Sequence, residues 1–141
     1  MKKIEFHNDR EPALDETTLN TMQSNIEEAI SYSSNEIEIG EWNGEKMYRK
    51  VISVPTSTFN TSSQTIDYNH GISNIDTVVN TYGKYFVGGY SRMIPTVFYN
   101  LDFCGQVMGG TSNVRFELGT GLRDLLADSD IIYVIIEYTK L

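Results

Sequence analysis

The C-terminal run Ile131–Tyr138 constrains the fold of this chain more than any other stretch. Its sequence, Ile-Ile-Tyr-Val-Ile-Ile-Glu-Tyr, consists almost entirely of β-branched and aromatic residues. Such a composition is typical of a strand that lies inside a sheet and is covered on both faces. We therefore predict a central strand here. Its apolar part, Ile131–Ile136, is far too short to cross a bilayer.

A second strong signal is the Asn43-Gly44 pair within residues 36–54. Asn-Gly favours a type I′ turn, because both central residues of that turn need positive φ. The segments on either side look extended, so the pair predicts a hairpin in which Trp42 lies beside Glu45.

Further short strands are expected after the hairpin, separated by turn-forming residues. Gly83 is expected to break one of them, and residues 122–126 fit either a helical turn or a short strand. The predicted strands cover residues 65–68, 76–87, 93–101, 105–108 and 113–118. Many short strands after one helix predict a mainly β chain, with an antiparallel β-sandwich over residues 36–141.

The helix is predicted over residues 16–30. Its apolar side chains follow the spacing of a coiled-coil seam at Leu19, Met22, Ile26 and Ala29, with Ile30 beside them. An isolated helix of this length is marginal in water, so the stripe packs either on the chain's own sheet or on copies of the chain. The spacing does not choose between two, three and four strands. We interpret residues 1–35 as an attachment segment with an oligomerisation helix, and residues 36–141 as a head domain.

Composition excludes several classes of function. The chain has 141 residues, enough for one domain with a short appendage, and a net charge of −8. This acidic balance argues against a surface that binds nucleic acid. Charged and polar residues follow Met1 at once, so we expect no signal peptide, synthesis in the cytoplasm and no insertion into a membrane.

Residues with nucleophilic chemistry are sparse. His7 and His70 are the only histidines and Cys104 is the only cysteine, so composition allows a His70–Cys104 pair. A buried Cys104, and a His70 that bonds the backbone while Gly71 supplies a turn, are favoured over that pair.

Metal-binding patterns are equally weak. Asp67, His70 and Asp76 match no known ligand spacing, and Asp128 and Asp130 fit a solvated turn better than a calcium site. The sequence therefore predicts no catalytic set, no cofactor and no metal, and the chain is not expected to be an enzyme.

Tyrosines offer better candidates for recognition. Nine tyrosines and one tryptophan stand among Asn, Ser, Thr and Gly, a composition typical of binding surfaces. The candidates for stacking on the sugar rings of a cell-wall polysaccharide are Tyr82, Tyr85, Tyr90 and Tyr99. In the alternative interpretation these rings fill the core and the subunit interface.

Three segments resemble a known family. Residues 39–51 (Ile-Gly-Glu-Trp-Asn-Gly-Glu-Lys-Met-Tyr-Arg-Lys-Val), 68–78 and 132–140 are similar to the C-terminal β-domain of tail-fibre and baseplate-type structural proteins of phages and prophages of Gram-positive bacteria. Residues 6–30 are similar to the segment that often precedes such domains. The resemblance implies a virion component without enzymatic activity, commonly a homotrimer with its helices on the threefold axis, whose partners are other tail or baseplate proteins.

Two classes of function follow. In the first, the protein is a trimeric adhesin or fibre head that binds a host cell-surface glycan. In the second, it is an architectural virion protein with no ligand. An exposed tyrosine cluster facing away from the helices would favour the first class, and a smooth polar distal face would favour the second. A cell-wall hydrolase is the least supported class, because no acid pair with a supporting histidine or metal stands out.

Overall fold

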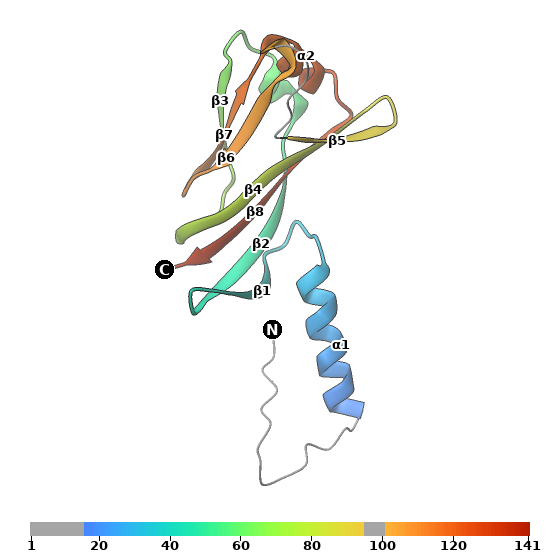
Figure 1. The fold of residues 1–141 in the computed structure, drawn as a ribbon, viewed down its shortest axis with the longest axis vertical. Helices are drawn as coiled ribbons and strands as arrows, with labels where there is room; N and C mark the ends of the chain where they lie inside the picture. Colours follow the sequence, from blue (N-terminus) through green and yellow to red (C-terminus); the bar gives the residue numbers. More distant parts are fainter. Residues whose placement is uncertain (1–15, 95–100) are drawn as a thin grey trace.

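The C-terminal strand lies at the centre of the larger of two antiparallel sheets (Figure 1). The computed structural model describes residues 16–94 and 101–141. Within them, the five-stranded sheet has the order β1-β2-β8-β4-β5, and the three-stranded sheet has the order β3-β7-β6. The elements are α1 (Glu16–Ile30), β1 (Ile37–Trp42), β2 (Glu45–Ser53), η1 (Thr56–Phe59), β3 (Thr65–Asn69), β4 (Ile75–Val87), β5 (Tyr90–Ile94), η2 (Leu101–Phe103), β6 (Gly105–Gly109), β7 (Asn113–Leu118), α2 (Thr120–Ala127) and β8 (Ile131–Lys140).

The predictions of a mainly β chain, an antiparallel arrangement and a central C-terminal strand are confirmed. The predicted hairpin forms as β1 and β2. Asn43 and Gly44 adopt φ values of 51° and 83°, and Trp42 pairs with Glu45. Helix α1 has the predicted range, and α2 resolves the ambiguity over residues 122–126 in favour of a helix.

Two predictions about strands are wrong. β4 is not broken at Gly83. The strand continues because Gly83 pairs with Ile94 of β5. The Ile94 side chain packs over this glycine, where an added Cβ atom would lie 3.1 Å from it. The strand predicted over residues 93–101 begins earlier, at Tyr90, and Leu101 starts a 3₁₀ turn. Residues 95–100 lie outside the described part of the chain.

One hydrophobic cluster draws side chains from both sheets and from α2. β8 contributes Ile132, Val134, Ile136 and Tyr138, all almost completely buried. The remaining large members include Phe59, Tyr85, Ile94, Phe116, Leu122 and Leu126. The sheets approach closely at β6, where a Cβ atom on Gly109 would come within 2.8 Å of Val78 in β4. Burial of these side chains is the main stabilising contribution to the fold.

A polar cluster ties the start of β1 to the end of β8. Tyr138 donates its hydroxyl hydrogen to Glu36 at 2.5 Å, and Lys140 Nζ lies 2.7 Å from the same carboxylate. Partial burial opposes the ionisation of Glu36. The hydrogen bonds from Lys140 and Tyr138 outweigh that burial and hold the pKa of this carboxyl below its ordinary value of 4.5.

This cluster predicts a specific loss of stability in acid. Because the pKa of Glu36 is lower in the folded chain, its contribution is complete above the unfolded value and disappears as the pH falls through the folded value. The variant Glu36→Gln replaces the carboxylate by a neutral amide. This change should lower the free energy of unfolding at pH 7 by about 1 kcal/mol, because the group is partly exposed. The difference between variant and parent should shrink as the pH falls through the lowered pKa of Glu36.

Urea denaturation at pH 7 and at an acid pH below the ordinary glutamate pKa of 4.5 measures this difference. Glu45→Gln is the matched control, because Glu45 is exposed in β2 and makes no ion pair with a described residue. A Glu36→Gln deficit that is equally large at both pH values would contradict the assignment.

Candidate functional site

An aromatic groove crosses the outward face of the five-stranded sheet, the face opposite the core. It encloses about 720 Å³, within the size range of ligand pockets. Its floor is formed by outward side chains of β2 and β8, namely Val51, Ser53, Tyr133 and Ile135. Strand pairing dictates this grouping, because side chains of directly paired antiparallel residues lie on the same face.

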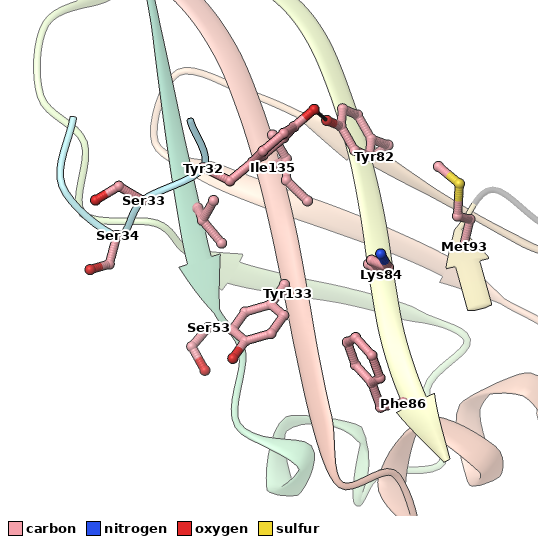
Figure 2. Close-up of a pocket in the computed structure, with 11 residues that line it drawn as sticks. Tyr32, Ser33, Ser34, Ser53, Tyr82, Lys84, Phe86, Met93, Tyr133 and Ile135 are labelled. Carbon is pink, nitrogen blue, oxygen red and sulfur yellow. Dashed lines mark hydrogen bonds between the residues drawn. The ribbon is translucent and has the colours of Figure 1, made fainter. Parts of the chain in front are cut away.

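The far side of the groove comes from β4 and β5. Tyr82 pairs with Ile135, Lys84 with Tyr133, and Met93 of β5 with Lys84, so all lie on the outward face. Phe86 lies beside them, with Lys84 Nζ 5.7 Å from the centre of its ring (Figure 2). The groove thus combines aromatic rings, hydroxyl groups and one cation.

The near wall is the linker between α1 and β1, residues 31–36. The backbone N–H of Val51 donates to Ser33 O at 2.8 Å, so the linker continues along β2 before β1 begins. Tyr32 then reaches over β8 to Tyr82, whose hydroxyl donates to the Tyr32 hydroxyl at 3.1 Å (Figure 2). This bridge covers Ile135, which is only 4% exposed.

Arg49 of β2 holds the linker in place. Its guanidinium pairs with Glu137 at 2.8 Å, donates to Ser31 O at 3.2 Å and lies 4.5 Å from the centre of the Tyr32 ring. Burial and the hydrogen bond to Tyr32 raise the pKa of Tyr82, so its hydroxyl stays protonated as a donor at neutral pH.

The four predicted sugar-stacking tyrosines do not gather in one place. Tyr82 lines the groove, half-buried, while Tyr90 is 72% exposed at the turn between β4 and β5. Tyr99 lies outside the described residues. The prediction for Tyr85 is wrong, because its side chain is fully buried in the core between the sheets.

The predicted oligomerisation residues lie on α1, which extends beyond the end of the five-stranded sheet (Figure 1). Leu19, Met22 and Ile26 are 51%, 40% and 60% exposed in the single chain. The side chains of Ala29 and Ile30 lie outside the described ones. The stripe therefore presents apolar surface that its own sheets do not cover.

His70 and Asp67 have structural partners. Ile72 N–H donates to His70 Nδ1 at 3.0 Å and His70 Nε2 lies 3.0 Å from Gly110 O, so both ring nitrogens are used by backbone, as predicted. With Nδ1 accepting, Nε2 carries the hydrogen. This engagement leaves no ring nitrogen to activate Cys104. Asp67 forms a two-bond pair with Arg115, at 2.8 and 2.9 Å.

Residues 16–94 and 101–141 contain neither a metal-binding cluster nor a membrane-spanning helix. No group of three or more His, Cys, Asp or Glu side chains in these ranges is placed to hold a metal ion. No helix in them has the length and apolar character needed to span a bilayer.

Sequence reasoning missed most of the groove. Tyr32, Lys84, Met93 and Tyr133 carry no local motif, and only the pairing of four strands places them together. One signal was available: Tyr82 and Tyr85 are three positions apart on a strand, so they lie on opposite faces and cannot both contact one ligand.

Comparisons with protein-family models, with curated proteins and with solved structures find no match to this chain. The function must therefore be argued from the chain's own geometry.

The correction for Tyr85 generates a stability prediction. Its hydroxyl is buried with no hydrogen-bond partner among the described residues. Removing an unsatisfied buried hydroxyl costs nothing in hydrogen bonding, so Tyr85→Phe should unfold at the same or a higher urea concentration. Tyr138→Phe is the matched comparison. It loses a hydrogen bond to a carboxylate and should cost about 1.5–3 kcal/mol. A larger loss for Tyr85→Phe than for Tyr138→Phe would refute the interpretation.

Proposed function

We propose that this chain is a structural component of a phage or prophage particle, of the tail-fibre or baseplate type, rather than an enzyme. In this proposal α1 assembles three copies as a short coiled coil, and residues 36–141 of each copy form a head. The other partners are tail or baseplate proteins of the same virion. The resemblance of residues 39–51, 68–78 and 132–140 to such proteins supplies the class.

The observation that carries the proposal is the exposed apolar stripe of α1. Leu19, Met22 and Ile26 point away from the chain's own core and are between 40% and 60% exposed. A 15-residue helix is marginally stable by itself. Packing the stripes of several copies together would bury these side chains and stabilise the helix.

The head is inferred to be a β-sandwich. Both sheets contribute to one core cluster, and β6 approaches β4 so closely at Gly109 that no larger residue fits without displacement. These contacts support two packed layers, with the linker and α1 attached at one end. We propose the division into residues 1–35 and 36–141 on this basis.

Light scattering on the purified chain tests the assembly. We expect the mass of a trimer at micromolar concentration, and a monomer for Ile26→Glu, because three carboxylates cannot share a buried seam. Ser24→Glu is the control: it adds the same charge at an exposed position of α1 outside the stripe. A parent chain with monomer mass would overturn the proposal, as would equal dissociation by both variants.

Binding of a host glycan is the second candidate, favoured by Tyr90. This ring is 72% exposed at the β4–β5 turn, which projects away from α1 (Figure 1). Gly88 and Gly89 form the turn with φ values of 56° and 81°, so the ring is presented by a tight connection.

A glycan array with the parent chain, Tyr90→Ala and Trp42→Ala tests this candidate. If Tyr90 stacks on a sugar, its removal should weaken binding severalfold, while removal of the exposed Trp42 on the other hairpin should not. An array without signal for the parent chain, or equal loss in both variants, would leave the architectural role alone.

A further inference from the structure

We infer that the aromatic groove is an interface between copies of this chain: a neighbouring copy covers the outward face of the five-stranded sheet. This inference rests on the proposed homotrimer and adds a second contact surface, separate from the α1 stripe. Its occupant is another copy of the chain.

The first argument is the composition of β8. Its inward residues fill the core. Of its outward residues the first three, Ile131, Tyr133 and Ile135, are also apolar, and Glu137 and Thr139 follow them. Ile131 is 41% exposed and Tyr133 is half-buried. A strand that is apolar on both sides is typical of a sheet covered on both faces, yet here the linker covers only one part of the second face.

The smaller sheet shows how a solvated outward face of this chain looks. Along β7, Val114, Phe116 and Leu118 are buried and alternate with exposed Arg115 and Glu117. The outward side chains of this sheet form polar pairs, Arg115 with Asp67 and Gln106 with Glu117. This contrast indicates that the groove face is covered by protein, whereas the outward face of the smaller sheet is exposed to water.

The second argument is continuity. The linker that forms the near wall of the groove is also the segment that follows α1. Tyr32 lines the groove and lies only two residues after the end of this helix. Chains that meet along α1 therefore bring their groove walls close together, because only a few residues separate the two surfaces. Once the helices have associated about one axis, contacts between the heads form within the assembly and cost little further rotational freedom.

The third argument is charge. Lys84 is the only charged residue that lines the groove, and it makes no ion pair with a described residue. A second copy carries 19 acidic against 11 basic residues, so it brings an excess of carboxylates. In a threefold arrangement each interface joins two different patches, so Lys84 does not face its own symmetry mate.

Three methionines make the inference testable in the full chain. Met22 reports on the α1 stripe, Met93 on the groove and Met108 on the outward face of the smaller sheet. They are 40%, 54% and 38% exposed in the single chain. Peroxide converts exposed methionine to its sulfoxide, so the rate at each site measures its cover. Rates measured by peptide mass spectrometry are divided by those of the urea-unfolded chain.

If a copy covers the groove, Met22 and Met93 should both oxidise severalfold more slowly than Met108. A protected Met22 with a fast Met93 would overturn the inference and leave the helical trimer intact. A fast Met22 would overturn the proposed function itself, and this inference with it. Protection of Met93 only after a saccharide mixture is added would identify a ligand site and reject the interface.

A matched pair of variants provides the second test. Met93→Glu places a charge in the groove, and Met108→Glu places the same charge on the polar sheet. We expect Met93→Glu to raise the concentration at which the trimer dissociates at least about tenfold, and Met108→Glu to leave that concentration unchanged. Circular dichroism shows whether each variant folds. Equal trimer stability of two folded variants would refute the interface.

Discussion

The guanidinium group of Arg49 is the contact on which the arrangement of the candidate surfaces depends. It is 13% exposed and joins three parts of the chain: its own strand β2, Glu137 of β8, and the linker through Ser31 and Tyr32. Fixing the linker has two effects. It sets the point where α1 leaves the sheet, and it holds Tyr32 against Tyr82 so that Ile135 is covered. A mostly buried ion pair such as Arg49–Glu137 stabilises little by itself, because desolvation of the two charges offsets their attraction. Its contribution here is positional, because it selects one path for the chain between helix and sheet.

One outward face of the head is polar and the other is largely apolar. This difference follows from how apolar and polar residues alternate along β7 and β8. β7 alternates strictly, so its outward side is polar and needs no cover. β8 does not alternate over residues 131–136, so both sides of this part are apolar and its second side needs cover. The linker supplies part of that cover around Ile135. The remainder, around Tyr133, Phe86 and Met93, is the groove.

Local signals in the sequence predicted the elements well and the site poorly. The Asn43-Gly44 turn, the seam spacing of α1 and the β-branched run of β8 are each encoded by neighbouring residues, and all three elements form as predicted. The groove depends on which strands pair, and in what register. Arg49 and Glu137 are 88 positions apart, and register shifts in β4 between Ile75 and Asn80 decide which face its later residues occupy. Periodicity in one segment separates Tyr82 from Tyr85, but it does not say which of the two faces the core; strand pairing places Tyr85 there.

A short helical seam also explains why the head should take part in assembly. Helix α1 spans about 22 Å at 1.5 Å per residue, and its described seam consists of Leu19, Met22 and Ile26. Stable interfaces bury on the order of 1,600 Å² in total, more than a seam of about two heptads provides between a pair of chains. The association of helices this short is also opposed by the cost of ordering each helix. A trimer held by α1 therefore needs further buried surface. The apolar surface that adjoins α1 through the linker is the groove, so we propose that the seam and the groove are two parts of one assembly surface.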